Sequence, residues 1–61
     1  MANLSEKELS FLEDQLSAEQ LLIKKFKAIS AEASDAEIKT CCDQIANKHQ
    51  QHFDTMMGFL N

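Results

Sequence analysis

The sequence has 61 residues, a formal net charge of −4, and hydrophobic residues at 44% of its positions. A chain of this length is expected to form one domain, residues 1–61. The hydrophobic core of so small a domain contributes no more than ~3–5 kcal/mol of stability. We therefore expect a metal ion or a partner chain to stabilise it further. One glycine, no proline and few β-branched residues argue against a β-sheet, and the acidic balance without arginine argues against nucleic acids and anionic membranes as partners.

The first predicted element is a helix over residues 6–32. Ser5 followed by Glu8 is a capping box, in which the serine hydroxyl accepts from a free backbone N–H and the glutamate reaches back. Apolar residues then recur at alternating steps of three and four, which is typical of helices that pack in bundles. The series runs through Leu9, Leu12, Leu16, position 19, Ile23 and Phe26. A further box, Ser17 with Gln20, is not expected to break the helix, because the series continues through it.

A polar segment over residues 30–35 predicts a turn, and Ser34 with Glu37 predicts the start of a second helix over residues 35–60. The same spacing returns at Ile38, Cys42, Ile45, positions 49 and 52, Met56 and Phe59. Other apolar residues flank both series: Phe11, Ala18, Leu22, Ile29, Cys41, Ala46, Phe53 and Leu60. Such wide faces exceed what one neighbouring helix covers. We therefore expect an all-α fold, an antiparallel helical hairpin that pairs with a second copy as a homodimeric four-helix bundle or a higher homo-oligomer.

Three positions of the two series carry polar residues: Glu19, His49 and His52. Burying an unpaired carboxylate costs several kcal/mol, so a glutamate in the series needs a partner. Glu19 lies about as far before the turn as the histidines lie after it, so all three should meet at one depth of the hairpin. Carboxylate and imidazole groups bind zinc, iron or manganese, so the three residues predict a transition-metal site.

Two other interpretations of these three residues stay open. The side chains form a buried hydrogen-bonding network without metal, or they lie where the bundle opens to water. No phosphate-binding glycine loop and no arranged nucleophile is found in the sequence, so no catalytic residue is predicted and a non-enzymatic role is favoured.

Cys41 and Cys42 are adjacent, and neighbouring residues on a helix point about 100° apart, so no disulfide is expected between them. Cys42 is interpreted as a small core residue, and both thiols as reduced. The sequence shows neither a signal peptide nor a long apolar run, and a soluble, cytoplasmic protein is expected.

The segment Leu9–Phe26, followed by Lys48–Phe53 (KHQQHF), resembles small proteins of the spore coat protein F-like family. The resemblance implies a minimal ferritin-like hairpin in a spore coat-associated structural protein, with coat assembly proteins as partners. Glu19 matches the glutamate that one ferritin-like helix contributes, and His52 matches the histidine of the Glu-x-x-His motif. His49 replaces the bridging glutamate of that motif, so the pattern favours a zinc-like site or a polar core over di-iron chemistry. The alternative is a metal-free module for self-association or docking.

Overall fold

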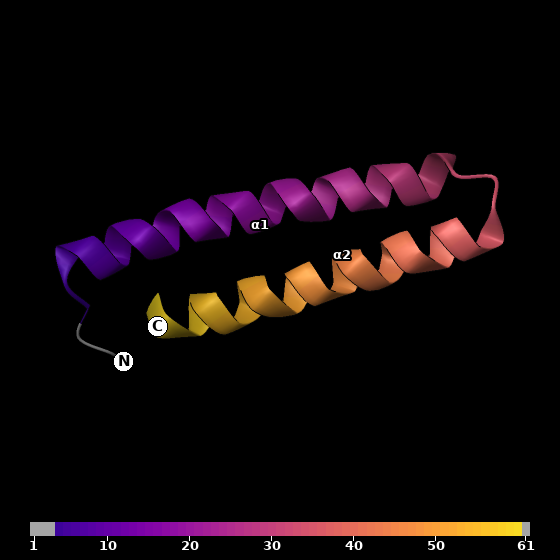
Figure 1. Cartoon of the computed structure of the whole chain (residues 1–61). Helices are drawn as coiled ribbons and strands as arrows, with labels where there is room; N and C mark the ends of the chain where they lie inside the picture. The colour runs from indigo at the N-terminus through magenta and orange to yellow at the C-terminus, as the bar shows by residue number, and fades with distance from the viewer. Residues whose placement is uncertain (1–3, 61) are drawn as a thin grey trace.

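The computed structural model describes residues 4–60 of the chain. Two long helices, α1 (Glu6–Glu32) and α2 (Ala36–Met57), are followed by a single 3₁₀ turn, η1 (Gly58–Leu60). The helices run antiparallel and are joined by residues 33–35 (Figure 1). The predicted all-helical hairpin is confirmed, and residues 4–60 contain no strand.

The start of α1 is the predicted capping box. The Glu8 backbone N–H donates to the Ser5 hydroxyl at 3.1 Å, and the Ser5 backbone N–H donates to Oε1 of Glu8 at 3.0 Å. Hydrogen bonding to Ser5 lowers the pKa of the exposed Glu8 carboxyl below its usual value of 4.5. The Ser5 backbone makes the larger contribution and the Ser5 side chain the smaller one. From this start α1 continues through Ser17 and Gln20 without a break, as expected.

The start of α2 differs from the prediction. Its N-cap is Asp35, not Ser34: the backbone N–H groups of Glu37 and Ile38 donate to Oδ1 of Asp35 at 2.9 and 3.0 Å. The predicted Ser34–Glu37 box is wrong because the next residue offers a charged acceptor, which the helix dipole also favours at this end. At the other end, the α-helix stops at Met57 and residues 58–60 tighten into η1, as the last turns of helices often do.

Two hydrogen bonds across the turn hold α1 and α2 together. The Lys39 ammonium donates to the Ser30 carbonyl at 2.7 Å, and the Ser30 hydroxyl donates to the Lys39 carbonyl at 3.4 Å. The lysine thus brings a positive charge to the end of α1, where backbone carbonyls lack helical partners. The sequence placed Ser30 in a polar turn, whereas the structure buries it within α1.

The core between the two helices is small. Its buried apolar residues are Leu16, Ile23, Cys42 and Ala46. Ala46 is the most buried of them at 2% exposure, although the sequence placed it at the flank. Ile38 and Phe59, which the series placed at the helix contact, are 52% and 47% exposed. Both apolar faces are wide, so the spacing alone does not show which part of each face the neighbouring helix covers.

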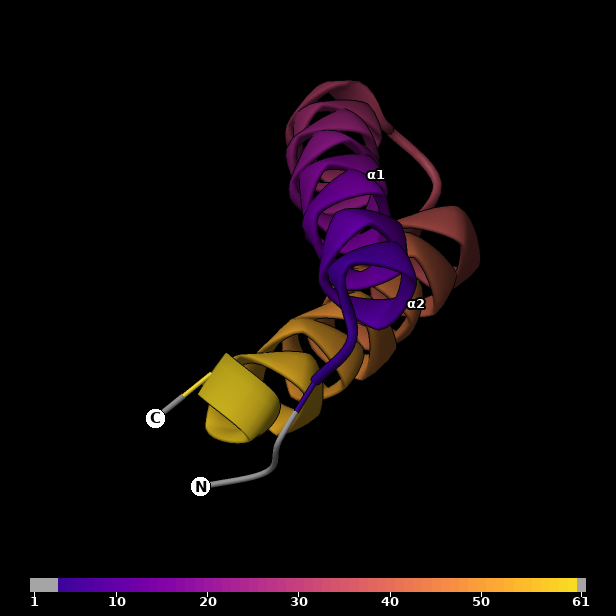
Figure 2. The same cartoon turned by 90° about the vertical axis from the view of Figure 1, so that its left-hand side faces the viewer.

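The hairpin is a long, thin, single layer (Figures 1 and 2), with Cα extents of 46 × 16 × 11 Å. Its radius of gyration is 14.2 Å, against about 10.5 Å for a compact domain of this length. Its accessible surface is 4724 Å², against about 4,000 Å² for a compact protein of this mass. The hairpin therefore exposes more surface than a compact protein of its mass, and large apolar side chains such as Phe11, Leu21 and Ile38 are part of it.

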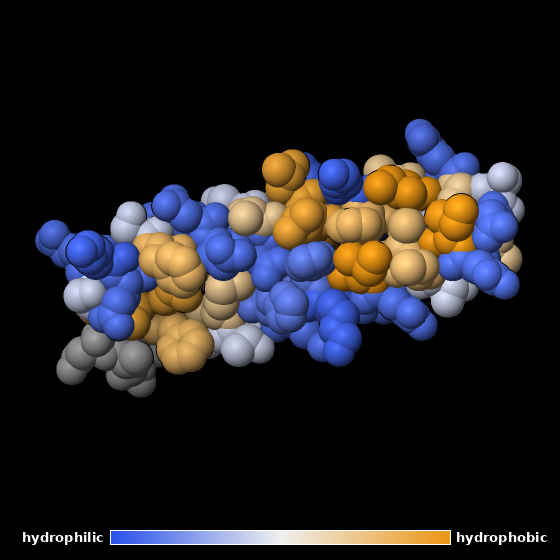
Figure 3. All heavy atoms as spheres, in the orientation of Figure 1, coloured by the Kyte–Doolittle hydropathy of each residue, from blue (hydrophilic) through white to orange (hydrophobic). Residues whose placement is uncertain are grey.

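One side of the hairpin, which we call the open face, gathers apolar side chains from both helices. Helical spacing assigns to this side the exposed residues Phe11, Ile29, Ile38 and Phe59 and the partly buried residues Leu22, Phe26, Ile45 and Met56. Phe11 and Phe59 line one cleft at the end away from the turn, and Ile29 and Ile38 line another beside the turn. Figure 3 shows hydrophobic atoms towards both ends of this face and a hydrophilic band between them.

Within residues 4–60, neither helix carries an apolar stretch long enough to cross a membrane.

Candidate metal centre

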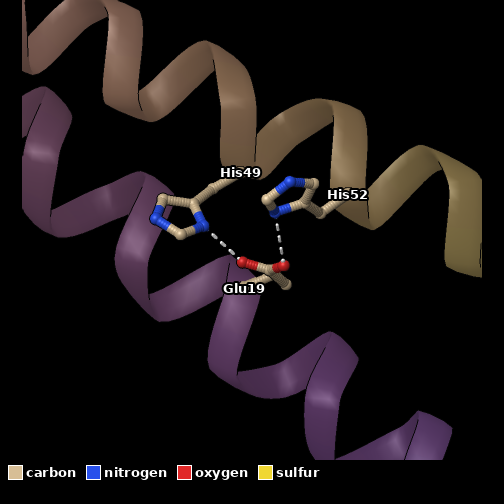
Figure 4. Close-up of side chains that lie close together, drawn as sticks. All are labelled: Glu19, His49 and His52. Atoms are coloured by element: carbon tan, nitrogen blue, oxygen red, sulfur yellow. Dashed lines mark hydrogen bonds and ion pairs between the residues drawn. The ribbon is translucent and has the colours of Figure 1, made fainter.

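Glu19, His49 and His52 lie together in the middle of the hairpin, at the common depth that the sequence predicts. In Figure 4 the carboxylate of α1 lies between two imidazole rings that descend from α2. Nδ1 of His49 is 2.5 Å from Oε1 of Glu19, and Nδ1 of His52 is 3.1 Å from Oε2. Each oxygen of one carboxylate therefore contacts a different histidine.

Helical spacing explains why these three side chains meet. Glu19 is at the midpoint of the 27-residue α1, three residues after Leu16 and four before Ile23, and all three are buried against α2. His49 follows Cys42 and His52 follows Ile45 by seven residues, or two helical turns, so both histidines continue the apolar series of α2.

Burial differs sharply among the three residues. Glu19 is 4% exposed, whereas the side chains of His49 and His52 are 22% and 56% exposed. A buried carboxylate needs donors, and the two imidazoles supply them when Nδ1 carries the proton. Across residues 4–60, no buried side-chain nitrogen or oxygen lacks a hydrogen-bond partner. The interpretation of a water-exposed position therefore fits His52 alone.

Ring contacts orient the two imidazoles. Phe26 stacks on His49 with the ring centroids 6.2 Å apart and the planes 17° from parallel. His49 meets His52 edge to face at 5.6 Å and 83°. With these orientations both Nδ1 atoms point at Glu19, while the second nitrogen of each ring points away from it (Figure 4).

The cluster offers three ligand atoms, one from each residue, that lie within 4.8 Å of one another. Ligands around a tetrahedral zinc ion are about 3.3–3.5 Å apart, because each bond is about 2.0–2.2 Å long. Binding an ion therefore requires the carboxylate and the His49 ring to separate by about 1 Å from hydrogen-bonding distance. When the two Nδ1 atoms coordinate the ion, they carry no proton, so in that arrangement the ion replaces the two hydrogen bonds to Glu19.

The two cysteines stand apart from this cluster. Cys42 is buried at 7% exposure in the core, as predicted, and Cys41 is exposed. Both thiols are free, and neither is among the three residues that could share an ion.

Comparisons of the chain with protein-family models, with curated proteins and with solved structures find no match. The resemblance to the spore coat protein F-like family stays a prediction. Function is therefore inferred from the cluster of Glu19, His49 and His52 and from the open face.

Proposed function

We propose that this chain binds one transition-metal ion through Glu19, His49 and His52, within a ferritin-like four-helix bundle formed by two copies. The observation that supports the metal site is the convergence of a buried carboxylate and two imidazole nitrogens, all within 4.8 Å. These donors suit zinc, and also iron or manganese. A bound ion ties α1 to α2 and adds its binding free energy to the folding of a chain with a small core.

The open face supports the proposed homodimer, because the hairpin leaves the apolar side chains of both helices exposed or partly exposed on that side. The role that agrees with the family resemblance is structural: a spore coat component that docks on other coat proteins. No catalytic residue is part of the proposal.

A metal titration tests the site. Protein purified without a histidine tag should bind about one Zn²⁺, Fe²⁺ or Mn²⁺ per chain by calorimetry, and its melting temperature should rise on binding and fall with a chelator. His49→Ala and His52→Ala should each weaken binding by at least about 10-fold. Gln51→Ala, at an exposed position between the two histidines, should bind like the wild type. No stoichiometric ion, together with melting that ignores zinc and chelator, would contradict the proposal.

A second candidate function is favoured by the hydrogen bonds from both histidines to Glu19. In this function the chain is a metal-free self-association module, and the Glu–His network only specifies the packing of the helices. Histidine ¹⁵N spectra distinguish the two functions. The network keeps a proton on both Nδ1 atoms after zinc is added, whereas metal binding removes it and moves both Nδ1 resonances.

A further inference from the structure

We infer that two copies of this chain dock through their open faces with their turns at opposite ends of the dimer. The inference rests on the proposed homodimer and specifies how the partner copy is oriented.

The uncovered area fits a second copy. The accessible surface of 4724 Å² exceeds that of a compact monomer by about 700 Å², and a standard interface buries about 800 Å² on each partner. Phe11 and Phe59 at one end of the open face, and Ile29 and Ile38 at the other, are spread along its whole length. The occupant must therefore be about as long as the hairpin itself, as a second copy is.

The hydrophilic band in the middle of the open face limits how the copies align (Figure 3). His52 is 56% exposed and contacts Glu19, which marks the midpoint of α1, so the polar cluster lies at the middle of the hairpin. A two-fold axis through the middle of the hairpin brings the two polar clusters opposite each other and lets apolar ends meet apolar ends. This alignment holds whether the two turns lie at the same end or at opposite ends.

Charge decides between these two orientations. The half of the hairpin away from the turn, residues 4–18 and 53–60, carries five carboxylates and one lysine, a net charge of −4. The half that contains the turn, residues 20–48, carries five lysines and four carboxylates, a net charge of +1. Turns at the same end bring the two −4 halves together, whereas turns at opposite ends pair each −4 half with a +1 half.

Some of these charged residues line the clefts of the open face: Glu32 and Asp35 line the cleft beside the turn, and Lys7 and Glu8 line the cleft at the other end. Turns at the same end would bring two Glu32–Asp35 pairs together across the interface, within the screening length of about 10 Å at 0.1 M salt. Like charges at that distance repel, so the orientation with opposite turns is the more stable one. In either orientation, the partner copy covers the exposed side chain of His52.

Distances between spin labels test the orientation. The variant Ser34→Cys with Cys41→Ser carries one exposed thiol per chain, because Cys42 is buried. Residue 34 lies about 22 Å along the helix axis from Glu19, so labels there should be about 45 Å apart when the turns are at opposite ends. With the turns at the same end, the labels would be within about 25 Å. Thr55→Cys with Cys41→Ser, labelled one turn beyond His52, should give a distance below about 35 Å in either orientation and serves as the control.

Sedimentation of the same labelled samples separates the two proposals. A dimer with the long distance at residue 34 supports the inference. A dimer with the short distance overturns the orientation and leaves the proposed homodimer intact. A monomer at micromolar concentration overturns the homodimer and the orientation together, while the metal titration still tests the ion site.

Discussion

Glu19 is the side chain on which the centre of the hairpin depends. It is 4% exposed, and its two oxygens accept from histidines three residues apart on the other helix. A carboxylate in this position both satisfies the imidazole donors and offers an oxygen to an ion. The charge and the two acceptors of Glu19 are therefore the properties to test by substitution.

Replacing Glu19 by glutamine tests both properties while nearly keeping the shape of the side chain. The amide has one acceptor oxygen and no charge, so one histidine N–H loses its acceptor. We expect the free energy of unfolding of the metal-free protein to fall by about 1–3 kcal/mol. Zinc affinity should fall by at least about 10-fold. Glu13→Gln, at an exposed position on the same helix, should change neither quantity. Unchanged zinc binding by Glu19→Gln would exclude the carboxylate as a ligand.

At the scale of the elements, the two helix starts are the best-defined local structures. α1 starts with a reciprocal capping box, and α2 starts with one aspartate that accepts two backbone N–H groups. The two starts therefore respond differently to substitution and to pH.

Asp35→Ala should lower the free energy of unfolding by about 1–2 kcal/mol, because two backbone donors at the start of α2 lose their acceptor. Ser34→Ala, one residue earlier, should change it by less than about 0.5 kcal/mol. Urea denaturation of both variants measures the difference. Equal effects would show that Ser34 shares the capping role.

The pH dependence of stability should include a contribution from Glu8. Its pKa in the folded protein lies below the usual value of 4.5. A lowered pKa means that its stabilising effect is complete above the unfolded value and is lost as the pH falls through the folded value. Thermal melting between pH 7 and pH 2 should therefore show less acid destabilisation in Glu8→Gln than in the wild type. Parallel curves for the two proteins would contradict this.

At the scale of the whole molecule, the open face is the main feature that a single hairpin leaves unexplained. Phe11 on this face and Leu21 away from it are 65% and 68% exposed. Leu21 lines a different cleft, with Ser17, Lys24 and Phe53. The two residues form a matched pair, because neither is needed for the packing of α1 on α2.

Phe11→Gln should raise the dimer dissociation constant by at least about 100-fold, since each copy loses one buried aromatic side chain. Leu21→Gln should leave the constant within about 3-fold of the wild type, because its side chain stays in water in both states. Sedimentation over a concentration series measures both constants, and neither substitution changes the net charge. Equal effects at the two positions would place the interface elsewhere.

The sequence predicted the elements well and the packing less well. Alternating steps of three and four, with Ser5 and Glu8, were enough to place α1 at 6–32. Asp35 was missed as the cap because a serine beside it matched the same pattern. Ala46 was missed as the centre of the contact between the helices, and Ile38 was placed there instead. Residue spacing shows which side of a helix is apolar, but not which part of that side the neighbouring helix covers.

The meeting of Glu19 with His49 and His52 was predictable because it depends on chain length from the turn, which counting residues provides. The different burial of the two histidines was not, because the burial of His52 depends on the side of α2 that α1 leaves open. Whether an ion replaces the two hydrogen bonds depends on the difference in free energy between the ion-bound and the hydrogen-bonded cluster. Residue spacing does not determine that difference.

The one carboxylate held by two histidines also opposes sliding of α1 along α2, in addition to the limit that the three-residue turn sets. An apolar series that repeats about every seven residues would accept a slip of one repeat, about 10.5 Å, with little loss of contact. After such a slip Glu19 would face apolar side chains, and its buried charge would have no donor. With or without an ion, the cluster therefore reinforces the alignment that the three-residue turn sets between the two helices, and opposes any rebuilding of the turn that would shift it.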